Sequence, residues 1–498
     1  MKKLATYLTA VSTLIIITAC ENQAKSKYGI FEGSNDIGNV THKGSIKFNA
    51  SDSSYAVTGG GANMWFDHDE FYYVWKKMSG DVAITADINW PGTEGDAHKK
   101  ACLIFRQTLD SSSAYADAVV HGDGLTSMQY RESKGAVTRE IQSNTNSPQR
   151  IRIEKQGDYF SMSIAFDDEN LKSSGGSFKL PLNEPFYIGL GVSSHNNDTL
   201  ETAIFSNVKI EKLTQKPDSS LTLESTLEVI PVSSFDRRVV YHTSNHIEAP
   251  NWSPDGKTLI YNSDGLLYKI PVEDGEPQVI PSGFAEKINN DHGISPDGKN
   301  LAISDQTETG QSMIYLMPIS GGDPKKLTSL SPSYWHGWSP DGSTIVYCAE
   351  RNGNYDVYSM TSSGGKETRL TTAEGLDDGP EYSPDGKYIY FNSVRSGTMQ
   401  IWRMHPNGSN QEQITTDDYN DWFAHPSPDG KWIAYVTFNT DIDPGDHPAN
   451  KDVMLRLMNL DTKEVQIMAK LFGGQGTMNV PSWSSDSQKL AFVSYRLK

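Results

Sequence analysis

The C-terminal half of the chain alternates short apolar runs with polar turns. Four-residue runs rich in β-branched and aromatic residues are typical of buried strands. Six of them recur at nearly even intervals, at 258–261, 300–303, 344–347, 388–391, 432–435 and 489–492. A second apolar run follows most of these, and a third, weaker run ends several units. With a short strand ahead of the first run, the pattern predicts repeated units of four antiparallel strands.

A turn signal precedes each first run. The tetrapeptide Ser-Pro-Asp-Gly begins at five positions and a diverged copy, Ser-Ser-Asp-Ser, at a sixth: Ser253, Ser295, Ser339, Ser383, Ser427 and Ser484. Pro presets φ at the second turn position, Ser and Asp bond to nearby backbone, and Gly suits the last position. The six positions are 42, 44, 44, 44 and 57 residues apart. A period in the low forties is typical of β-propeller blades.

Six motifs predict six blades. The chain ends at Lys498, after only part of the last unit. The apolar runs 227–232 and 238–242 stand before the first motif and can supply its missing strands, which would close the ring. An open array of hairpins is the alternative, but it would leave exposed strand edges that favour aggregation.

The N-terminal part of the chain lacks this period. From about residue 28 to 213, apolar and polar positions alternate over short runs such as 82–88, 151–154, 159–164 and 203–208, separated by Gly, Asn and Asp turns. Many short alternating strands predict a β-sandwich. The fold class expected from the sequence is therefore all-β, with an N-terminal sandwich and a C-terminal propeller.

Both halves resemble known families. Residues 227–498 resemble the TolB-like six-bladed propellers through segments 250–256, 338–342 and 382–386, which carry the turn motif. Residues 28–213 resemble concanavalin-like jelly rolls through segments 61–65, 71–75, 99–106, 187–191 and 205–210. These resemblances imply an envelope protein from the first and carbohydrate binding from the second. Residues 214–226 form the expected linker.

The N-terminus predicts export. Two lysines follow Met1, an apolar run extends from residue 4 to 17, and small residues precede Cys20. Such a segment is a secretory signal rather than a membrane span. It resembles a bacterial lipoprotein signal, which implies a signal peptide at 1–19, lipidation at Cys20 and a tether at 20–27. The expected location is the cell envelope, with a lipid anchor on the outer membrane as the only membrane contact.

The charge narrows the range of partners. The chain has 62 acidic and 44 basic residues and a formal net charge of −18. Nucleic-acid binding requires clusters of basic residues. We therefore expect no nucleic-acid partner, and we expect a glycan or an envelope protein instead.

The residues just before each turn motif are expected to lie at one opening of the central channel of the propeller. We call this opening the mouth, and its residues predict that it is polar. Three histidines stand two or three residues before a motif, and carboxylates and amides stand nearby. His and carboxylates together suit general acid–base chemistry or a divalent cation, and Trp rings can stack on a sugar. A polar, water-filled channel is the alternative. The candidate catalytic residues are His292, His336, His425 and Glu381.

Further residues at this mouth are candidates for binding. The candidate ligand-binding residues are Asn290, Asp291, Trp335, Asp378, Trp422, Gln475 and His447. A divalent cation is a candidate cofactor, with His292, His336 and His425 as its candidate ligands. The last repeat step contains an acidic insertion at 439–451, which either folds over the mouth or forms a solvated loop.

Three functions are compatible with these features. The first is a lipid-anchored envelope protein that binds, and in one version processes, an extracellular glycan at the propeller mouth. The second is a TolB-like envelope protein–protein interaction module without catalysis. The third is a metal-assisted polysaccharide lyase. Whether the chain is an enzyme is left open by the sequence.

Overall fold

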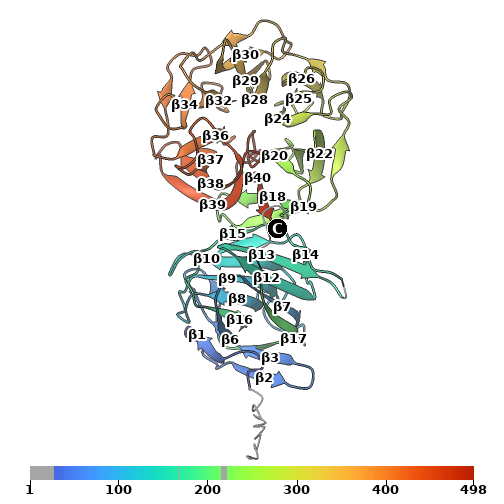
Figure 1. Cartoon of the computed structure of the whole chain (residues 1–498), viewed down its shortest axis with the longest axis vertical. Helices are drawn as coiled ribbons and strands as arrows, with labels where there is room; N and C mark the ends of the chain where they lie inside the picture. Colours follow the sequence, from blue (N-terminus) through green and yellow to red (C-terminus); the bar gives the residue numbers. More distant parts are fainter. Residues whose placement is uncertain (1–26, 168, 215–220) are drawn as a thin grey trace, which may run out of the picture.

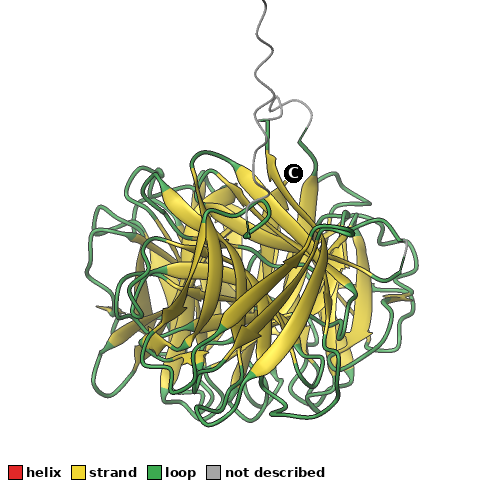
Figure 2. Cartoon of the chain, turned by 90° about the horizontal axis from the view of Figure 1, so that it is seen from below, coloured by secondary structure: helices red, strands yellow, loops and turns green. Residues whose placement is uncertain are grey.

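The computed structural model describes residues 27–167, 169–214 and 221–498. Over these residues the chain forms strands and loops, with no helix that could cross a bilayer (Figure 2). A sandwich and a ring of blades lie end to end along the long axis of the molecule (Figure 1). The predicted signal peptide, Cys20 and part of the predicted linker lie outside the described residues.

The N-terminal region contains two facing sheets. The first follows the order β1(Gly33–Ile37), β6(Phe71–Met78), β16(Phe186–Ser193), β8(Lys100–Arg106), β9(Tyr115–His121), β10(Thr126–Arg131) and β11(Arg139–Gln142). Strands β8, β9 and β10 are buried on both faces. One face packs on the second sheet, and the other carries a smaller apolar cluster around Phe71 and Tyr115.

The second sheet covers the other side of this core. Its order is β14(Lys172–Ser173), β13(Tyr159–Ala165), β12(Arg150–Gln156), β7(Val82–Asn89), β17(Glu201–Lys212), β3(Ser54–Gly59) and β2(Ser45–Asn49), with β15(Phe178–Lys179) paired to β13. A short hairpin, β4(Met64–Trp65) and β5(His68–Asp69), lies outside both sheets. Two sheets enclose one core, as predicted; the finer assignment to a concanavalin-like jelly roll stays a prediction.

Five separate four-stranded sheets form blades around a ring (Figure 1). In chain order, the first blade consists of β20(Ile247–Trp252), β21(Thr258–Ser263), β22(Leu266–Pro271) and β23(Gln278–Ile280), and the second of β24(Ile288–Ile294), β25(Asn300–Asp305), β26(Met313–Pro318) and β27(Lys325–Lys326). The third blade consists of β28(Ser333–Trp338), β29(Thr344–Arg351), β30(Asn354–Thr361) and β31(Thr368–Arg369), and the fourth of β32(Asp377–Tyr382), β33(Ile389–Ser393), β34(Gln400–Met404) and β35(Glu412–Gln413). The fifth blade consists of β36(Asn420–Pro426), β37(Trp432–Phe438), β38(Ala449–Asn459) and β39(Val465–Gly474).

The turn motif makes the same contacts in each unit. In the first copy, the Ser253 hydroxyl donates to Asp255 over 2.6 Å and accepts from the backbone N–H of Thr258 over 3.0 Å. Gly256 has a φ of +70°, a left-handed conformation that favours glycine. In the diverged sixth copy, Ser487 takes this conformation with a φ of +61°.

The prediction of six separate blades is wrong: the structure has five. The strands predicted to complete the last unit do pair, since β40(Lys489–Leu497) lies against β18(Leu223–Pro231), which lies against β19(Arg237–Thr243). However, β19 also pairs in parallel with β11 of the sandwich. The three strands therefore extend the first sandwich sheet to ten strands. The turn spacing carries no information on this lateral pairing.

A buried ion pair lies at the junction between the two regions. Arg237 on β19 binds Glu228 on β18 over 2.6 Å, and both side chains have no solvent exposure. Arg237 also donates to the carbonyl of Ser177 in the sandwich over 2.7 Å, and Ser494 on β40 donates to Glu228 over 2.5 Å. Four distant segments are joined at this one position.

Removing one charge of this pair should destabilise the protein strongly. Glu228→Gln leaves the guanidinium of Arg237 buried without a counter-charge, which typically costs about 3–5 kcal/mol. Urea unfolding monitored by tryptophan fluorescence would measure the loss. The matched control is Glu273→Gln, which breaks the 3.3 Å contact to Arg238 at a glutamate side chain that is 81% exposed. This exposed pair should matter little. Equal stability of the two variants would contradict the assigned role of the pair.

Candidate functional site

The innermost strands of all five blades are irregular at the same place. Their pairing register shifts between Glu248 and Asn251, Ile288 and His292, Trp335 and Gly337, Asp378 and Glu381, and Trp422 and His425. Such β-bulges kink a strand and turn its side chains. Each bulge lies just before a turn motif, in the segments that the sequence assigns to the mouth.

These segments surround a cavity of about 580 Å³ on the propeller axis. Its lining comes from every blade and from the last repeat unit, and consists of Glu248, Asn289, Asn290, Asp291, Gln306, Tyr334, His336, Cys348, Tyr355, Leu376, Asp378, Phe423, Gly445, His447, Gln475 and Asn479. We call this the mouth cavity. Six of the candidate residues line it: Asn290, Asp291, His336, Asp378, His447 and Gln475.

The other candidates are not among the lining residues. His292 is fully buried, with Nδ1 at 3.0 Å from Asn251 Oδ1. His425 lies 2.6 Å from Glu381 through Nδ1 and 3.1 Å from the carbonyl of Met478 through Nε2. These contacts position the rings among protein groups, away from a ligand in the mouth cavity.

The two candidate stacking residues are also internal. Trp335 and Trp422 have no solvent exposure, so neither indole offers a face to a ligand. Trp335 belongs to an apolar cluster between blades. Trp422 instead stacks on the ring of His447, with centroids 4.4 Å apart and planes 4° apart. The prediction that these indoles stack directly on a sugar is wrong, because both side chains are buried inside the propeller.

The insertion at 439–451 reaches the mouth, as predicted. Gly445 and His447 from this segment line the cavity. Phe423, whose φ of +57° is unusual for a non-glycine residue, lies between His447 and His336, with centroid distances of 5.3 and 6.0 Å. The insertion therefore contributes one wall of the mouth cavity.

Carboxylates dominate the electrostatics of the mouth cavity. Asp378 lies 3.1 Å from His336 Nε2. Burial disfavours the charged form of both residues, but the attraction between His336 and Asp378 is the larger effect. The pKa of His336 is therefore raised, and the pKa of Asp378 is held well below its usual value. Burial raises the pKa of Asp291 to about 7; His336 opposes this shift, and Asp378 and Glu248 add to it. An ion pair thus lies beside a carboxyl group that binds a proton near neutral pH.

The histidines do not form a common metal site. His336, His292 and His425 each contact a different partner. Within residues 27–167, 169–214 and 221–498, no group of three or more His, Cys, Asp or Glu side chains is placed to hold a metal ion. The suggested ligand set of these three histidines gains no support from the geometry.

Sequence position identifies more of the lining than residue chemistry does. The residue five positions before the turn motif lines the cavity in five of the six units, namely Glu248, Asn290, Tyr334, Asp378 and Asn479. Of these, Glu248, Tyr334 and Asn479 were not among the candidate residues. Gln306 and Tyr355 come from outer segments of the blades, and the repeat gave no signal for them.

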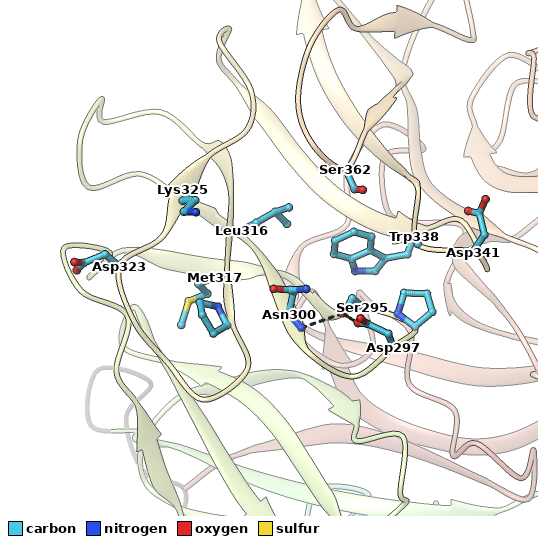
Figure 3. Close-up of a pocket in the computed structure, with 13 residues that line it drawn as sticks. Ser295, Asp297, Asn300, Leu316, Met317, Asp323, Lys325, Trp338, Asp341 and Ser362 are labelled. Atoms are coloured by element: carbon cyan, nitrogen blue, oxygen red, sulfur yellow. Dashed lines mark hydrogen bonds between the residues drawn. The ribbon is translucent and has the colours of Figure 1, made fainter.

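The repeat itself also produces a groove on the face of the propeller that carries the turn motifs. Ser295 and Asp297 of one motif and Asp341 of the next line a groove of about 400 Å³, together with Trp338 (Figure 3). The backbone N–H of Asn300 donates to the Ser295 hydroxyl there. A similar groove of about 510 Å³ lies between the motifs at Ser383 and Asp429. Because equivalent turns produce both grooves, neither marks a unique site.

Comparisons with known proteins identify relatives of the propeller. A family model described as the TolB beta propeller domain matches residues 331–447. An uncharacterized protein of Agrobacterium fabrum is 50% identical over 275 residues, which is 55% of this chain and 93% of that protein. A solved structure from Agrobacterium tumefaciens, provisionally named TolB, is 51% identical with a TM-score of 0.54 and covers 55% of this chain and 99% of that one.

A shorter match links the chain to a named system. The Tol-Pal system protein TolB of Francisella tularensis is 31% identical over 93 residues, which is 18% of this chain and 21% of that protein. This chain therefore spans about a fifth of that relative.

The raised pKa of Asp291 predicts a pH-dependent stability. The folded-state pKa of about 7 lies above the usual value of about 3.9 for an unfolded chain, so this carboxyl group destabilises the fold increasingly as the pH rises between these values. Asp291→Asn removes the penalty. Relative to the natural protein, it should gain at least about 1.4 kcal/mol, equivalent to one pKa unit, between about pH 5 and about pH 8.

Urea unfolding at the two pH values would measure this gain. Asp441→Asn, at an exposed position outside the cavity lining, is the matched control and should show no such trend. A difference between Asp291→Asn and the natural protein that is the same at both pH values would contradict the assigned environment of Asp291.

Proposed function

Because this chain belongs to the family of TolB-like β-propeller proteins, we propose that it is a cell-envelope interaction protein that binds a partner segment at the mouth cavity. The family match supports a binding role more strongly than glycan processing. Propellers host many activities, so the cavity itself must supply the rest of the argument.

The composition of the mouth cavity carries this proposal. Glu248, Asp291 and Asp378 line it, and its lining within the described chain includes no lysine or arginine. Amides and two tyrosines add hydrogen-bonding groups beside Phe423. The cavity has an apolar contact, several amides and three carboxyl groups, of which Asp378 is paired with His336. Such a cavity suits an extended peptide that carries a lysine, an arginine or a free amino terminus.

Glycan binding at the same cavity has less support. The indoles expected to stack on a sugar are buried. An acidic polysaccharide, the substrate of the lyase hypothesis, would meet three carboxyl groups and no lysine or arginine among the described lining groups, and His336 is already paired with Asp378. Like charges in a site of this kind repel, and the cost rises as water is excluded.

The proposed location rests on the N-terminal segment. Export and lipidation at Cys20 would tether the protein to the envelope, with the outer membrane as the proposed address. The propeller would then face partners in the same compartment.

Charge-matched peptide libraries provide a direct test. Basic, neutral and acidic peptides of equal length would be compared for binding to the purified protein by fluorescence polarisation. We expect the basic peptides to bind most tightly, and Asp378→Asn to weaken this binding by at least about tenfold. Asp441→Asn removes the same charge from an exposed part of the insertion and should leave the affinity unchanged.

A glycan array under the same conditions separates the alternatives. Glycan binding that Asp378→Asn abolishes, without any preference for basic peptides, would replace the proposed function with the glycan hypothesis. Release of unsaturated sugars from a polysaccharide would support the lyase hypothesis instead.

A further inference from the structure

A second cavity lies in the sandwich, on the face of the first sheet that points away from the main core. It has a volume of about 250 Å³. Four adjacent strands, β8 to β11, supply one polar side chain each to its lining: Lys100, His121, Gln129 and Glu140. Their neighbours in sequence belong to the main core, so these four side chains point the other way. We call this the sandwich cavity.

Two of these four side chains are charged groups of opposite sign, and both are buried. Lys100 is 2% exposed and Glu140 is 5% exposed. Neither forms an ion pair with any residue that the structure describes. An isolated buried charge is costly, so buried charges are normally paired. One cavity therefore holds a cation and an anion that both lack a counter-charge.

A glutamine side chain lies between the two charges. Lys100 Nζ donates to the Gln129 side-chain oxygen over 3.0 Å, and Gln129 Nε2 donates to Glu140 over 3.0 Å. The amide oxygen thus faces the ammonium group, and the amide nitrogen faces the carboxylate. The two charges are separated by one amide group, a gap that a single small molecule can span.

Both charged groups retain hydrogen-bonding capacity. Lys100 has three N–H donors and uses two of them, toward Gln129 and a backbone carbonyl. Oε1 of Glu140 accepts from two donors, whereas Oε2 accepts only from Gln142 Nε2, over 2.7 Å. A carboxylate oxygen can accept two hydrogen bonds, so one more donor can bind at Oε2. One acceptor and one donor can therefore be added to this lining.

The neighbouring ionisable groups do not supply the missing charges. Burial lowers the pKa of His121 to about 2, which keeps its ring neutral. Asp117 accepts the backbone N–H of Gln129 over 3.2 Å, and its other oxygen has no partner. Burial raises the pKa of Asp117 to about 8, so its carboxyl group is mostly protonated near neutral pH. Burial also lowers the pKa of Lys100, a shift that a bound carboxylate would oppose.

The rest of the lining is partly apolar. Trp65 and Leu125 line the sandwich cavity, and Lys100 Nζ lies 5.2 Å from the centre of the Trp65 ring. The imidazoles of His98 and His195 also line it, with centroids 5.5 Å apart. Among the residues that the structure describes, no three His, Cys, Asp or Glu side chains are placed to hold a metal ion, so these imidazoles count as hydrogen-bonding groups.

We propose that the sandwich cavity binds a free α-amino acid. The carboxylate of the ligand accepts the remaining N–H of Lys100, and its ammonium group donates to Oε2 of Glu140. The ligand then lies beside the Gln129 amide, with its oxygen and nitrogen atoms in the same order as those of the amide. Trp65 and Leu125 contact an apolar side chain of the ligand. A cavity of about 250 Å³, smaller than the usual range for drug-sized ligands, fits a molecule of one residue.

Other ligand classes match the two charges less well. A neutral sugar would leave both Lys100 and Glu140 without a counter-charge. An anion such as phosphate would meet Glu140, and a cation would meet Lys100, so an ion of one sign pairs one charge and is repelled by the other. This inference is independent of the proposed function, which depends on the mouth cavity alone.

Calorimetric titration of the purified full-length protein tests the proposal. The probes are L-leucine and L-phenylalanine. Each is compared with the smaller molecule that lacks its ammonium group, isocaproate or hydrocinnamate, and with the one that lacks its carboxylate, isoamylamine or phenethylamine. We expect saturable binding of at least one amino acid, and binding of both its one-charge analogues that is weaker by at least about tenfold. D-glucose, inorganic phosphate and Zn²⁺ should also bind more weakly.

A variant of the anionic group adds a second test. Glu140→Gln removes the charge at nearly constant shape and should weaken the bound amino acid by at least about tenfold. Its matched control is Glu132→Gln, which removes a charge at a side chain that is 40% exposed and outside the cavity lining, and which should leave the affinity unchanged. Thermal unfolding checks that Glu140→Gln is folded. If it is not, the one-charge analogues decide the question on the natural protein.

Three outcomes would overturn the proposal. The first is that the folded protein binds neither amino acid. The second is equal affinity for an amino acid and either of its one-charge analogues, or equal affinity of folded Glu140→Gln and the natural protein. The third is tighter binding of D-glucose, phosphate or Zn²⁺ than of both amino acids, which would assign that class of ligand to the cavity.

Discussion

The buried ion pair between Arg237 and Glu228 is the interaction on which the arrangement of the two regions depends. Isolated buried charges cost several kcal/mol each, so the pair is tolerated only where its partners are complete. Completion requires β18, β19, β40 and the Ser177 carbonyl of the sandwich at one position. The contacts that close the ring therefore also attach the ring to the sandwich.

The mouth cavity lies on the framework that this junction holds together, because the inner strands of the blades carry it. Three carboxyl groups and no lysine or arginine line this cavity within the described chain, and one of the three, Asp378, is paired with His336.

The candidate site was only partly predictable from the sequence. The position five residues before the turn motif identified Asp378 and Asn290, because a repeat places equivalent residues at equivalent heights on the inner strands. The same rule failed at Trp422, because His447 of the insertion stacks on its indole and lines the cavity in its place. Where the insertion lies against the blades is decided only when the chain folds, and side-chain chemistry alone does not reveal it.

The sequence by itself determined the local structure. Its turn motif set the conformation at Gly256, its apolar runs set the strands, and its period set a ring closed by the two ends of the propeller region. Only the tertiary structure decided that five blades are separate and that the remaining strands join the sandwich through β11 and β19. The physical reason is the separation along the sequence over which each kind of interaction acts. Turn and strand preferences act between residues near in sequence, whereas edge pairing and the burial of polar groups depend on segments that meet only after folding.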